Sequence, residues 1–138
     1  MKQDEMNEYA VLFKNVFNGA PWNDKWTLET ASKRIADMMN TSTFLGMAFY
    51  IEKELAGIIF GQQEQWYNGL HFQIQEFCID KKHQGKGLGS QLLDVFIEEL
   101  RRKEIFQIYL HTSKGQSTEG FYKGRGFMTS GDMVLMYK

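Results

Sequence analysis

A strand-like segment, a long amphipathic helix and a second strand-like segment follow one another between residues 70 and 111. This order constrains the fold more than any other feature of the sequence. Leu70–Asp80 and Ile105–His111 have the apolar patterns of strands. Between them, apolar residues recur at helical spacing at Leu88, Leu92, Leu93, Phe96, Ile97 and Leu100. Two strands joined through a helix pair in parallel with a right-handed crossover, so the chain is predicted to contain a parallel strand pair.

The segment before this unit has the pattern of an antiparallel meander. Phe44–Glu52 and Leu55–Gln63 are short apolar runs, separated by charged residues that form a turn. A second turn at Asn68-Gly69 leads into the strand that begins at Leu70. A meander joined to a parallel pair predicts a mixed sheet.

Helical patterns precede the sheet, and a short helix and a strand are predicted to follow it. Asp4–Phe17 carries apolar residues at helical spacing, and Thr27–Met39 does the same behind a threonine that can cap a helix. Ser117–Lys123 is predicted to be a short helix, and Phe127–Tyr137 a closing strand. The predicted order is ααβββαβαβ, an α/β fold with a central mixed sheet flanked by helices. The length favours a single domain spanning residues 1–138.

Composition excludes several classes of function. The net charge of -1 and the lack of a long Lys/Arg run argue against a nucleic-acid partner. No apolar run approaches the roughly 20 residues needed to span a bilayer, and the polar N-terminus is unlike a signal peptide. The single cysteine, Cys78, cannot form an internal disulfide, and the histidines are too scattered to suggest a metal site. We therefore expect a soluble cytoplasmic protein with no membrane, nucleic-acid or metal partner.

A glycine-rich segment, Gln84-Gly85-Lys86-Gly87-Leu88-Gly89-Ser90, lies between a predicted strand and a predicted helix. Glycines allow the backbone to approach a phosphate closely, and the N–H groups of a helix N-terminus attract anions. The segment fits neither the G-x-G-x-x-G dinucleotide pattern nor the Gly-Lys-Ser/Thr nucleotide loop. It is interpreted as a pyrophosphate-binding loop, although a glycine-rich turn without a ligand would look the same.

The pattern Gln84-x-x-Gly87-x-Gly89 resembles the Arg/Gln-x-x-Gly-x-Gly/Ala signature of the GNAT superfamily of acyl-CoA-dependent N-acetyltransferases. Three further segments agree in order and spacing over roughly residues 44 to 130: the strand glycine Gly57, the central strand 75–79, and the late segment 120–127. The chain departs from the family in beginning with a helix instead of a strand, and in having 114-Lys-Gly-Gln-116 where many members carry an asparagine.

The resemblance implies a fold in which the strands containing Cys78 and Ile108 splay apart around acetyl-CoA, which serves as co-substrate. The backbone near the first of these strands would bind the pantetheine arm, and the glycine-rich segment would bind the pyrophosphate. The implied coenzyme-binding residues are Phe77, Cys78, Ile79, Gln84, Gly85, Lys86, Gly87, Leu88, Gly89 and Ser90. The Cys78 N–H is also a candidate hydrogen-bond donor to the reaction's oxyanion.

Acetyl transfer to an amine requires a base for the amine and a proton donor for the departing sulfur. By resemblance to the family, Glu76 is the candidate base and Tyr122 the candidate acid. Each has an alternative, since Glu76 could be a solvated or ion-paired strand carboxylate and Tyr122 a packing residue. Cys78 is a poor candidate nucleophile, because no basic residue is close to it in sequence.

Aromatic and acidic residues in loops suggest how an acceptor amine would be bound. Trp22, Asp24, Trp26 and Trp66 would suit a cationic amine through cation–π and charge contacts. The same aromatics could instead be peripheral core or the contacts of a homodimer. An N-acetyltransferase acting on a small amine is therefore predicted. A non-catalytic acyl-CoA-binding module and a protein-interaction domain on the same fold remain the alternatives.

Overall fold

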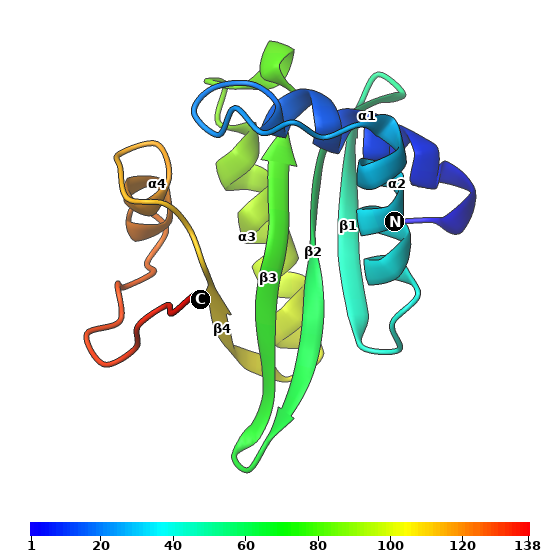
Figure 1. Cartoon of the computed structure of the whole chain (residues 1–138). Helices are drawn as coiled ribbons and strands as arrows, with labels where there is room; N and C mark the ends of the chain where they lie inside the picture. Colours follow the sequence, from blue (N-terminus) through cyan, green and yellow to red (C-terminus); the bar gives the residue numbers. More distant parts are fainter.

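The computed structural model describes all residues from Met1 to Lys138. After a 3₁₀ turn at Gln3–Glu5, the elements are α1 (Met6–Phe17), α2 (Leu28–Met39), β1 (Phe44–Ile51), β2 (Glu54–Trp66), β3 (Gly69–Ile79), a 3₁₀ turn at Lys81–His83, α3 (Leu88–Arg102), β4 (Ile105–Leu110) and α4 (Glu119–Lys123). Figure 1 shows these elements along the chain. Every element predicted between residues 4 and 123 is present, with ends that shift by a few residues.

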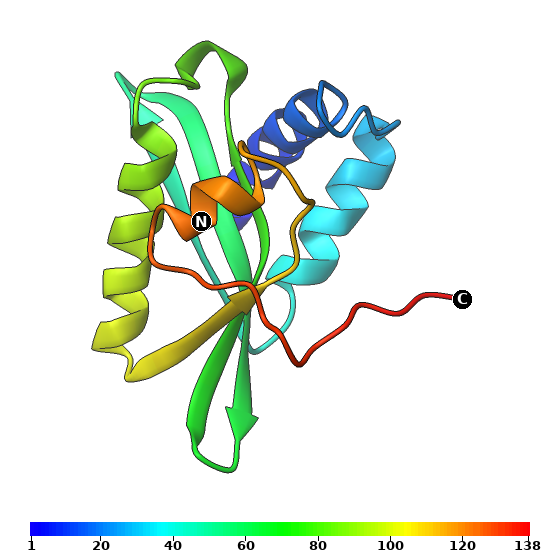
Figure 2. The same cartoon turned by 90° about the vertical axis from the view of Figure 1, so that its left-hand side faces the viewer.

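The four strands form one mixed sheet in the order β1-β2-β3-β4. β1 pairs with β2 and β2 with β3 in antiparallel fashion, whereas β3 and β4 are parallel and α3 connects them. Figure 2 shows α3 on one face of the sheet and α1 and α2 on the other. The predicted mixed α/β fold, a meander joined to a parallel pair, is confirmed.

Each face of the sheet has its own hydrophobic core. On one face, α1 and α2 bury Tyr9, Phe13 and Ile35 against Ile58 and Phe60 of β2. On the other, α3 buries its apolar stripe against β2, β3 and β4, and the buried residues include Ile59, Phe72, Leu92, Leu93 and Phe96. Each fully buried side chain of this size stabilises the fold by about 1.5–3 kcal/mol. Alternation along β2 and β3 directs neighbouring residues to opposite cores.

The start of α2 agrees with the capping prediction. The Thr27 hydroxyl accepts a hydrogen bond from the Thr30 N–H at 3.1 Å, and the Thr30 hydroxyl accepts one from the Thr27 N–H at 3.0 Å. This reciprocal box satisfies N–H groups that a helix N-terminus leaves without intrahelical partners. It also defines where the α1–α2 loop ends, which matters because that loop forms one wall of the site described below.

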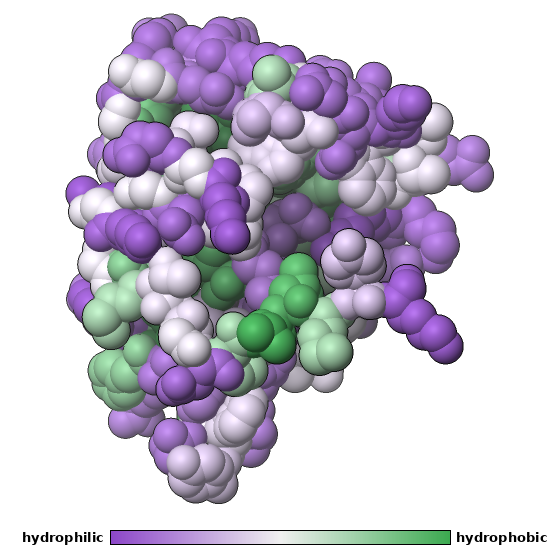
Figure 3. All heavy atoms as spheres, turned by 60° about the vertical axis from the view of Figure 1, so that its left-hand side comes forward, coloured by the Kyte–Doolittle hydropathy of each residue, from purple (hydrophilic) through white to green (hydrophobic).

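The predicted closing strand at Phe127–Tyr137 is wrong. The Phe127 N–H donates to Tyr122 O, and residues 128–138 then form no backbone ladder with any strand. Strands exist only where their backbone groups pair with a neighbour, and this segment pairs with neither β4 nor itself. Its large apolar side chains are exposed, namely Met128, Met133, Val134, Leu135, Met136 and Tyr137. Figure 3 brings this side forward and shows green hydrophobic atoms beside a purple-lined recess.

The last helix is shorter than the predicted range Ser117–Lys123. α4 begins at Glu119, and neither Ser117 nor Thr118 caps it through a side chain. The Thr118 hydroxyl instead donates to Ser113 O at 2.7 Å, so it fastens the loop that follows β4. None of the helices combines the length and the apolar character needed to cross a membrane.

Candidate active site

The site lies where β3 and β4 separate. Their parallel register runs from Leu70↔Ile105 to Ile74↔Leu110 and then stops, although β3 continues to Ile79. The chain after Leu110 turns away from β3 and leads to α4. The predicted splaying of the two strands is therefore present, and one side of the last residues of β3 has no strand beside it.

The backbone of β3 offers free hydrogen-bonding groups at this opening. The Asp80 N–H donates to Ala56 O at 2.8 Å, so Asp80 faces β2. Alternation along an antiparallel ladder then directs the backbone groups of Cys78 toward β2 as well, and those of Phe77 and Ile79 toward the opening. The Ile79 carbonyl is already used, because it accepts a hydrogen bond from the Gln84 side chain at 2.9 Å. The Cys78 N–H is therefore not oriented for an oxyanion, and Phe77 offers that group instead.

The glycine-rich segment forms the turn into α3. Gly85 and Gly87 have φ angles of 75° and 78°, in the left-handed region that favours glycine. A Cβ at either position would have no atom within 4 Å, so space remains open over the turn. The N–H groups at the start of α3 have no partner four residues earlier, and the helix dipole adds positive potential there. This arrangement can bind an anion such as a diphosphate.

A cavity of about 460 Å³ follows the opening, and we call it the larger cavity. One wall consists of β3 and the glycine turn, and the other of the α1–α2 loop together with the segment from β4 to α4. Its lining includes eight of the ten predicted coenzyme-binding residues: Phe77, Cys78, Ile79, Gln84, Gly85, Gly87, Gly89 and Ser90. Lys86 and Leu88 do not line it. Burial raises the pKa of the Cys78 thiol, which therefore stays protonated and unsuited to attack.

A second cavity of about 250 Å³, the smaller cavity, lies on the α1–α2 side of β3. Its lining includes Glu76 and Gln75 from β3, together with aromatic residues of α1 and of the α1–α2 loop. The two cavities have four lining residues in common: Trp22, Phe77, Thr112 and Tyr122. Ligands in the two cavities would therefore meet beside Tyr122.

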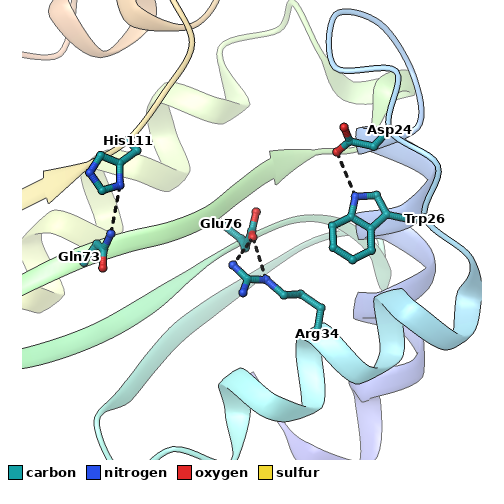
Figure 4. Close-up of polar contacts among 6 residues, drawn as sticks. All are labelled: Asp24, Trp26, Arg34, Gln73, Glu76 and His111. Carbon is teal, nitrogen blue, oxygen red and sulfur yellow. Dashed lines mark hydrogen bonds and ion pairs between the residues drawn. The ribbon is translucent and has the colours of Figure 1, made fainter. Parts of the chain in front are cut away.

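Glu76 is held in the smaller cavity by an ion pair. Its Oε1 accepts hydrogen bonds from Nη2 and Nε of Arg34 on α2, at 2.8 and 3.2 Å, as Figure 4 shows. The Glu76 side chain is only 15% exposed. Burial raises the pKa of Glu76, and this outweighs the lowering by the hydrogen bond and charge of Arg34. A carboxylate with a raised pKa is a stronger base than an exposed one.

Tyr122 is positioned by the aromatic residues around it. Its ring packs against Phe77, Phe121 and Phe127, with centroid distances of 6.4, 5.1 and 5.5 Å. An ion pair between Arg125 and Asp94 of α3 ties the end of α4 in place. Burial and the nearby Glu76 charge raise the pKa of Tyr122 to about 12. The phenol is therefore protonated at neutral pH and able to donate a hydrogen bond.

Three of the four predicted acceptor-binding residues come together. Trp22, Asp24 and Trp26 line the smaller cavity, and the Trp26 Nε1–H donates to Asp24 Oδ2 at 3.0 Å. The Asn18 side chain accepts from the Trp26 N–H at 2.7 Å and donates to Trp26 O at 2.8 Å, which orders this loop. Trp66 lies elsewhere, at the end of β2 and stacked on His71.

Sequence reasoning missed two residues: Gln75, which lines this cavity, and Arg34, which pairs with Glu76. Gln75 sits at a bulge, where the β2–β3 register shifts, and its Oε1 is buried without a hydrogen-bond partner. Arg34 is 42 residues from Glu76 in the chain, and nothing in the local pattern links them. The sequence signal for Gln75 is limited to its being one of several polar residues in β3, and nothing in the sequence marks the bulge.

Comparison with known families decides which fold this is. The family model described as an acetyltransferase (GNAT) domain matches residues 4–136, nearly the whole chain. The chain belongs to the GNAT acetyltransferase family. GNAT acetyltransferases transfer acyl groups and bind acetyl-CoA and acceptor substrates.

Solved structures of similar shape agree with the GNAT fold. A possible acetyltransferase from Clostridium difficile 630 superposes with a TM-score of 0.84 at 14% identity, covering 100% of this chain and 93% of that one. An aminoglycoside acetyltransferase from an uncultured soil metagenomic sample has a TM-score of 0.71 at 13% identity, covering 98% and 89%. A ribosomal-protein-alanine N-acetyltransferase from Brucella melitensis biovar Abortus 2308 has a TM-score of 0.74 at 12% identity, covering 100% and 94%. No curated protein sequence matches the chain. At these identities the similarity concerns the fold alone.

Proposed function

We propose that this protein is an N-acetyltransferase that moves the acetyl group of acetyl-CoA directly to the primary amine of a small cationic molecule. The observation that carries the proposal is the meeting of the two cavities at Tyr122. Direct transfer needs the thioester and the amine in contact, and two cavities that share one wall satisfy this without a covalent enzyme intermediate. The buried, protonated Cys78 thiol supports the same conclusion.

The larger cavity suits the coenzyme. Free N–H groups at the glycine turn would receive the diphosphate, and the open backbone of Phe77 would hydrogen-bond the end of the pantetheine arm that carries the thioester. The coenzyme supplies an activated acetyl group. The Phe77 N–H is the candidate donor to the carbonyl oxygen as negative charge develops there, because it lies beside Tyr122 on the opening side of β3.

The smaller cavity suits a cationic amine. Asp24 and Glu76 supply negative charge, and the Trp22 and Trp26 rings supply aromatic surface. Gln75 adds a more specific argument, because its buried Oε1 lacks a hydrogen bond that an N–H of the acceptor would provide. A buried acceptor without a partner is costly, and an incoming amine would remove that cost.

Glu76 and Tyr122 would have different roles in the transfer. Glu76 would take a proton from the ammonium, directly or through water, with Oε1 held by Arg34 and Oε2 left to act. The amine nitrogen would then attack the thioester carbon, the C–S bond would break, and the sulfur would leave as a thiolate. The second proton of the amine would pass to this thiolate, which gives the neutral amide and the free coenzyme A thiol. Tyr122 would hydrogen-bond that sulfur. With a pKa of about 12, its phenol is a weaker acid than a thiol of about 8.5, so hydrogen bonding is favoured over full proton transfer.

An acyl-CoA-binding module without turnover is the second candidate. The ion pair between Glu76 and Arg34 favours it, because a carboxylate that is paired with an arginine can have a purely structural role. Two measurements separate the candidates: calorimetric titration with acetyl-CoA, followed by release of free thiol in the presence of an amine panel. Binding with amine-dependent thiol release supports the transferase. Binding without release from any amine would favour the module, and a failure to bind would reject both.

A further inference from the structure

The β2–β3 hairpin extends beyond the helices and leaves part of one sheet face uncovered (Figure 1). Strand register places the side chains of this uncovered part together, since Glu64 pairs with His71 and Gln73 pairs with Tyr109. We call this part the hairpin face, and it consists of Glu64, Trp66, His71, Gln73, Tyr109 and His111. Nothing in the proposed acetyl transfer uses it.

Glu64 is the shared hydrogen-bond acceptor of the hairpin face. Both of its carboxylate oxygens lie 2.9 Å from the Tyr109 hydroxyl, and Oε2 also accepts from the Trp66 Nε1–H at 3.2 Å. Burial and the hydrogen bond to Glu64 raise the pKa of Tyr109 to about 12, so this donor stays protonated. No lysine or arginine forms an ion pair with Glu64, whereas nine ion pairs occur elsewhere in the protein. Neutral donors thus orient the Glu64 carboxylate, and no lysine or arginine side chain neutralises its charge.

The same arrangement occurs in the smaller cavity. Asp24 precedes Trp26 by two residues and accepts from its Nε1–H, as Glu64 does from Trp66. Each pair presents a carboxylate beside an indole, a combination that attracts an organic cation through both charge and the aromatic face. The Trp66 ring is held by stacking on His71, at 4.9 Å between centroids and 10° between planes. The protein therefore carries this kind of cation-binding pair twice.

The hairpin face is continuous with the smaller cavity. His111 lines that cavity and also belongs to the hairpin face, where its Nδ1 lies 3.4 Å from the Gln73 amide (Figure 4). The Tyr109 ring lies 6.4 Å from the His111 ring and bonds to Glu64 in turn. Glu64 lies four residues along β2 from Phe60, the partner of Glu76. At about 3.3 Å per residue, Glu64 is therefore displaced from Glu76 by on the order of 13 Å along the strand direction.

We propose that Glu64, with Trp66 and Tyr109, binds a second cationic group of the acceptor, so that the preferred acceptors are elongated molecules with an ammonium at each end. This inference rests on the proposed function and deepens it. One amine would enter the smaller cavity to react, while the other, held at Glu64 about 13 Å further along the strand direction, selects the molecule by its length. The rival role of these residues is docking to another protein through the exposed aromatic rings.

The test compares α,ω-diamines with ω-amino alcohols of the same length, in propane, hexane, octane and decane series. The two members of a pair differ only in the charge of the distant end. In the wild-type protein, the ratio of kcat/KM for diamine over amino alcohol should rise from the propane pair to the longer pairs. Glu64→Gln should lower that ratio about three- to tenfold for the longer pairs, and Tyr109→Phe should lower it less. Glu8→Gln, which removes an exposed charge on α1, serves as the matched control.

Calorimetry of octane diamine binding to the protein saturated with coenzyme A provides a readout without turnover. Weaker binding to Glu64→Gln than to Glu8→Gln supports the second cation site. Equal binding, or a kcat/KM ratio that is unchanged in Glu64→Gln, would overturn it even if every amine is acetylated well. Weaker diamine binding to Glu64→Gln, together with no thiol release from any amine, would reject the proposed acetyl transfer and still support the second cation site. Wild-type activity that is equal for diamines and amino alcohols would also overturn the second site.

Discussion

The larger and the smaller cavity are built from different kinds of groups. The larger one is made mainly of backbone, with left-handed glycines, the free N–H groups at the start of α3 and the unpaired edge of β3. The smaller one is made of side chains from α1, the α1–α2 loop, β3, the end of β4 and the segment after it, and Arg34 of α2 holds its Glu76. Recognition by backbone needs a short contiguous motif, whereas recognition by side chains draws on residues far apart in the chain. The difference predicts that mutations will separate coenzyme binding from acceptor binding.

Tyr122→Phe tests the junction of the two cavities and should have the largest effect. The substitution keeps the ring and its packing and removes only the hydroxyl. We expect kcat to fall by about 10²- to 10³-fold, because one hydrogen-bond donor to the developing thiolate charge is lost, with little change in acetyl-CoA affinity. Measuring kcat, the acetyl-CoA Kd and Tm on one preparation separates the roles. A lower Tm with near wild-type kcat would make Tyr122 a packing residue.

Gly87→Val tests the larger cavity. A β-branched residue at a φ of 78° is strained, and the strain would disturb the N–H groups at the start of α3. We expect acetyl-CoA affinity to fall about tenfold or more, measured by calorimetry on protein that circular dichroism shows to be folded. Gly131→Val is the control, because Gly131 has a negative or extended φ and open space around it. Equal affinities of the two variants would reject the glycine turn as the diphosphate site.

Gln75→Leu tests the smaller cavity. The change keeps the approximate volume and removes a buried oxygen that has no partner, so the free protein should be as stable as the wild type or more stable. The amine KM should rise about five- to tenfold, because the acceptor loses a hydrogen bond, while the acetyl-CoA Kd stays unchanged. A lower Tm with an unchanged amine KM would mean that Gln75 serves the fold and not the ligand.

Arg34→Met tests whether Glu76 is the base, and it should have the smallest effect on kcat/KM at neutral pH. Arg34 lowers the pKa of Glu76 against the larger raising by burial, so its removal should raise that pKa further. If ionised Glu76 is the base, activity is lost as pH falls through its pKa. The acid limb of kcat/KM should therefore move to higher pH in Arg34→Met and disappear in Glu76→Gln. An acid limb that Arg34→Met leaves in place would show that Glu76 does not take the proton.

Local patterns were sufficient for most of the fold. The apolar stripe of α3, the Thr27 cap and the strand patterns of β1 to β3 depend on neighbours within a few residues, so they are visible in the sequence. The prediction of a closing strand was wrong because pairing does not depend on neighbours in the sequence. Residues 127–137 have strand-like apolar content, but a strand needs a partner, and the partner is a property of the folded sheet.

The amino-acid sequence by itself determined the order of the elements from α1 to α4, the mixed sheet and the glycine turn before α3, because each follows from periodicity or from a contiguous motif. Only the tertiary structure decided that Arg34 pairs with Glu76, that a bulge leaves Gln75 without a partner, and that Glu64 gathers Tyr109 and Trp66. The Arg34–Glu76 and Glu64–Tyr109 contacts join residues on different elements. Their formation depends on strand register and helix placement, which are set by packing of the whole molecule.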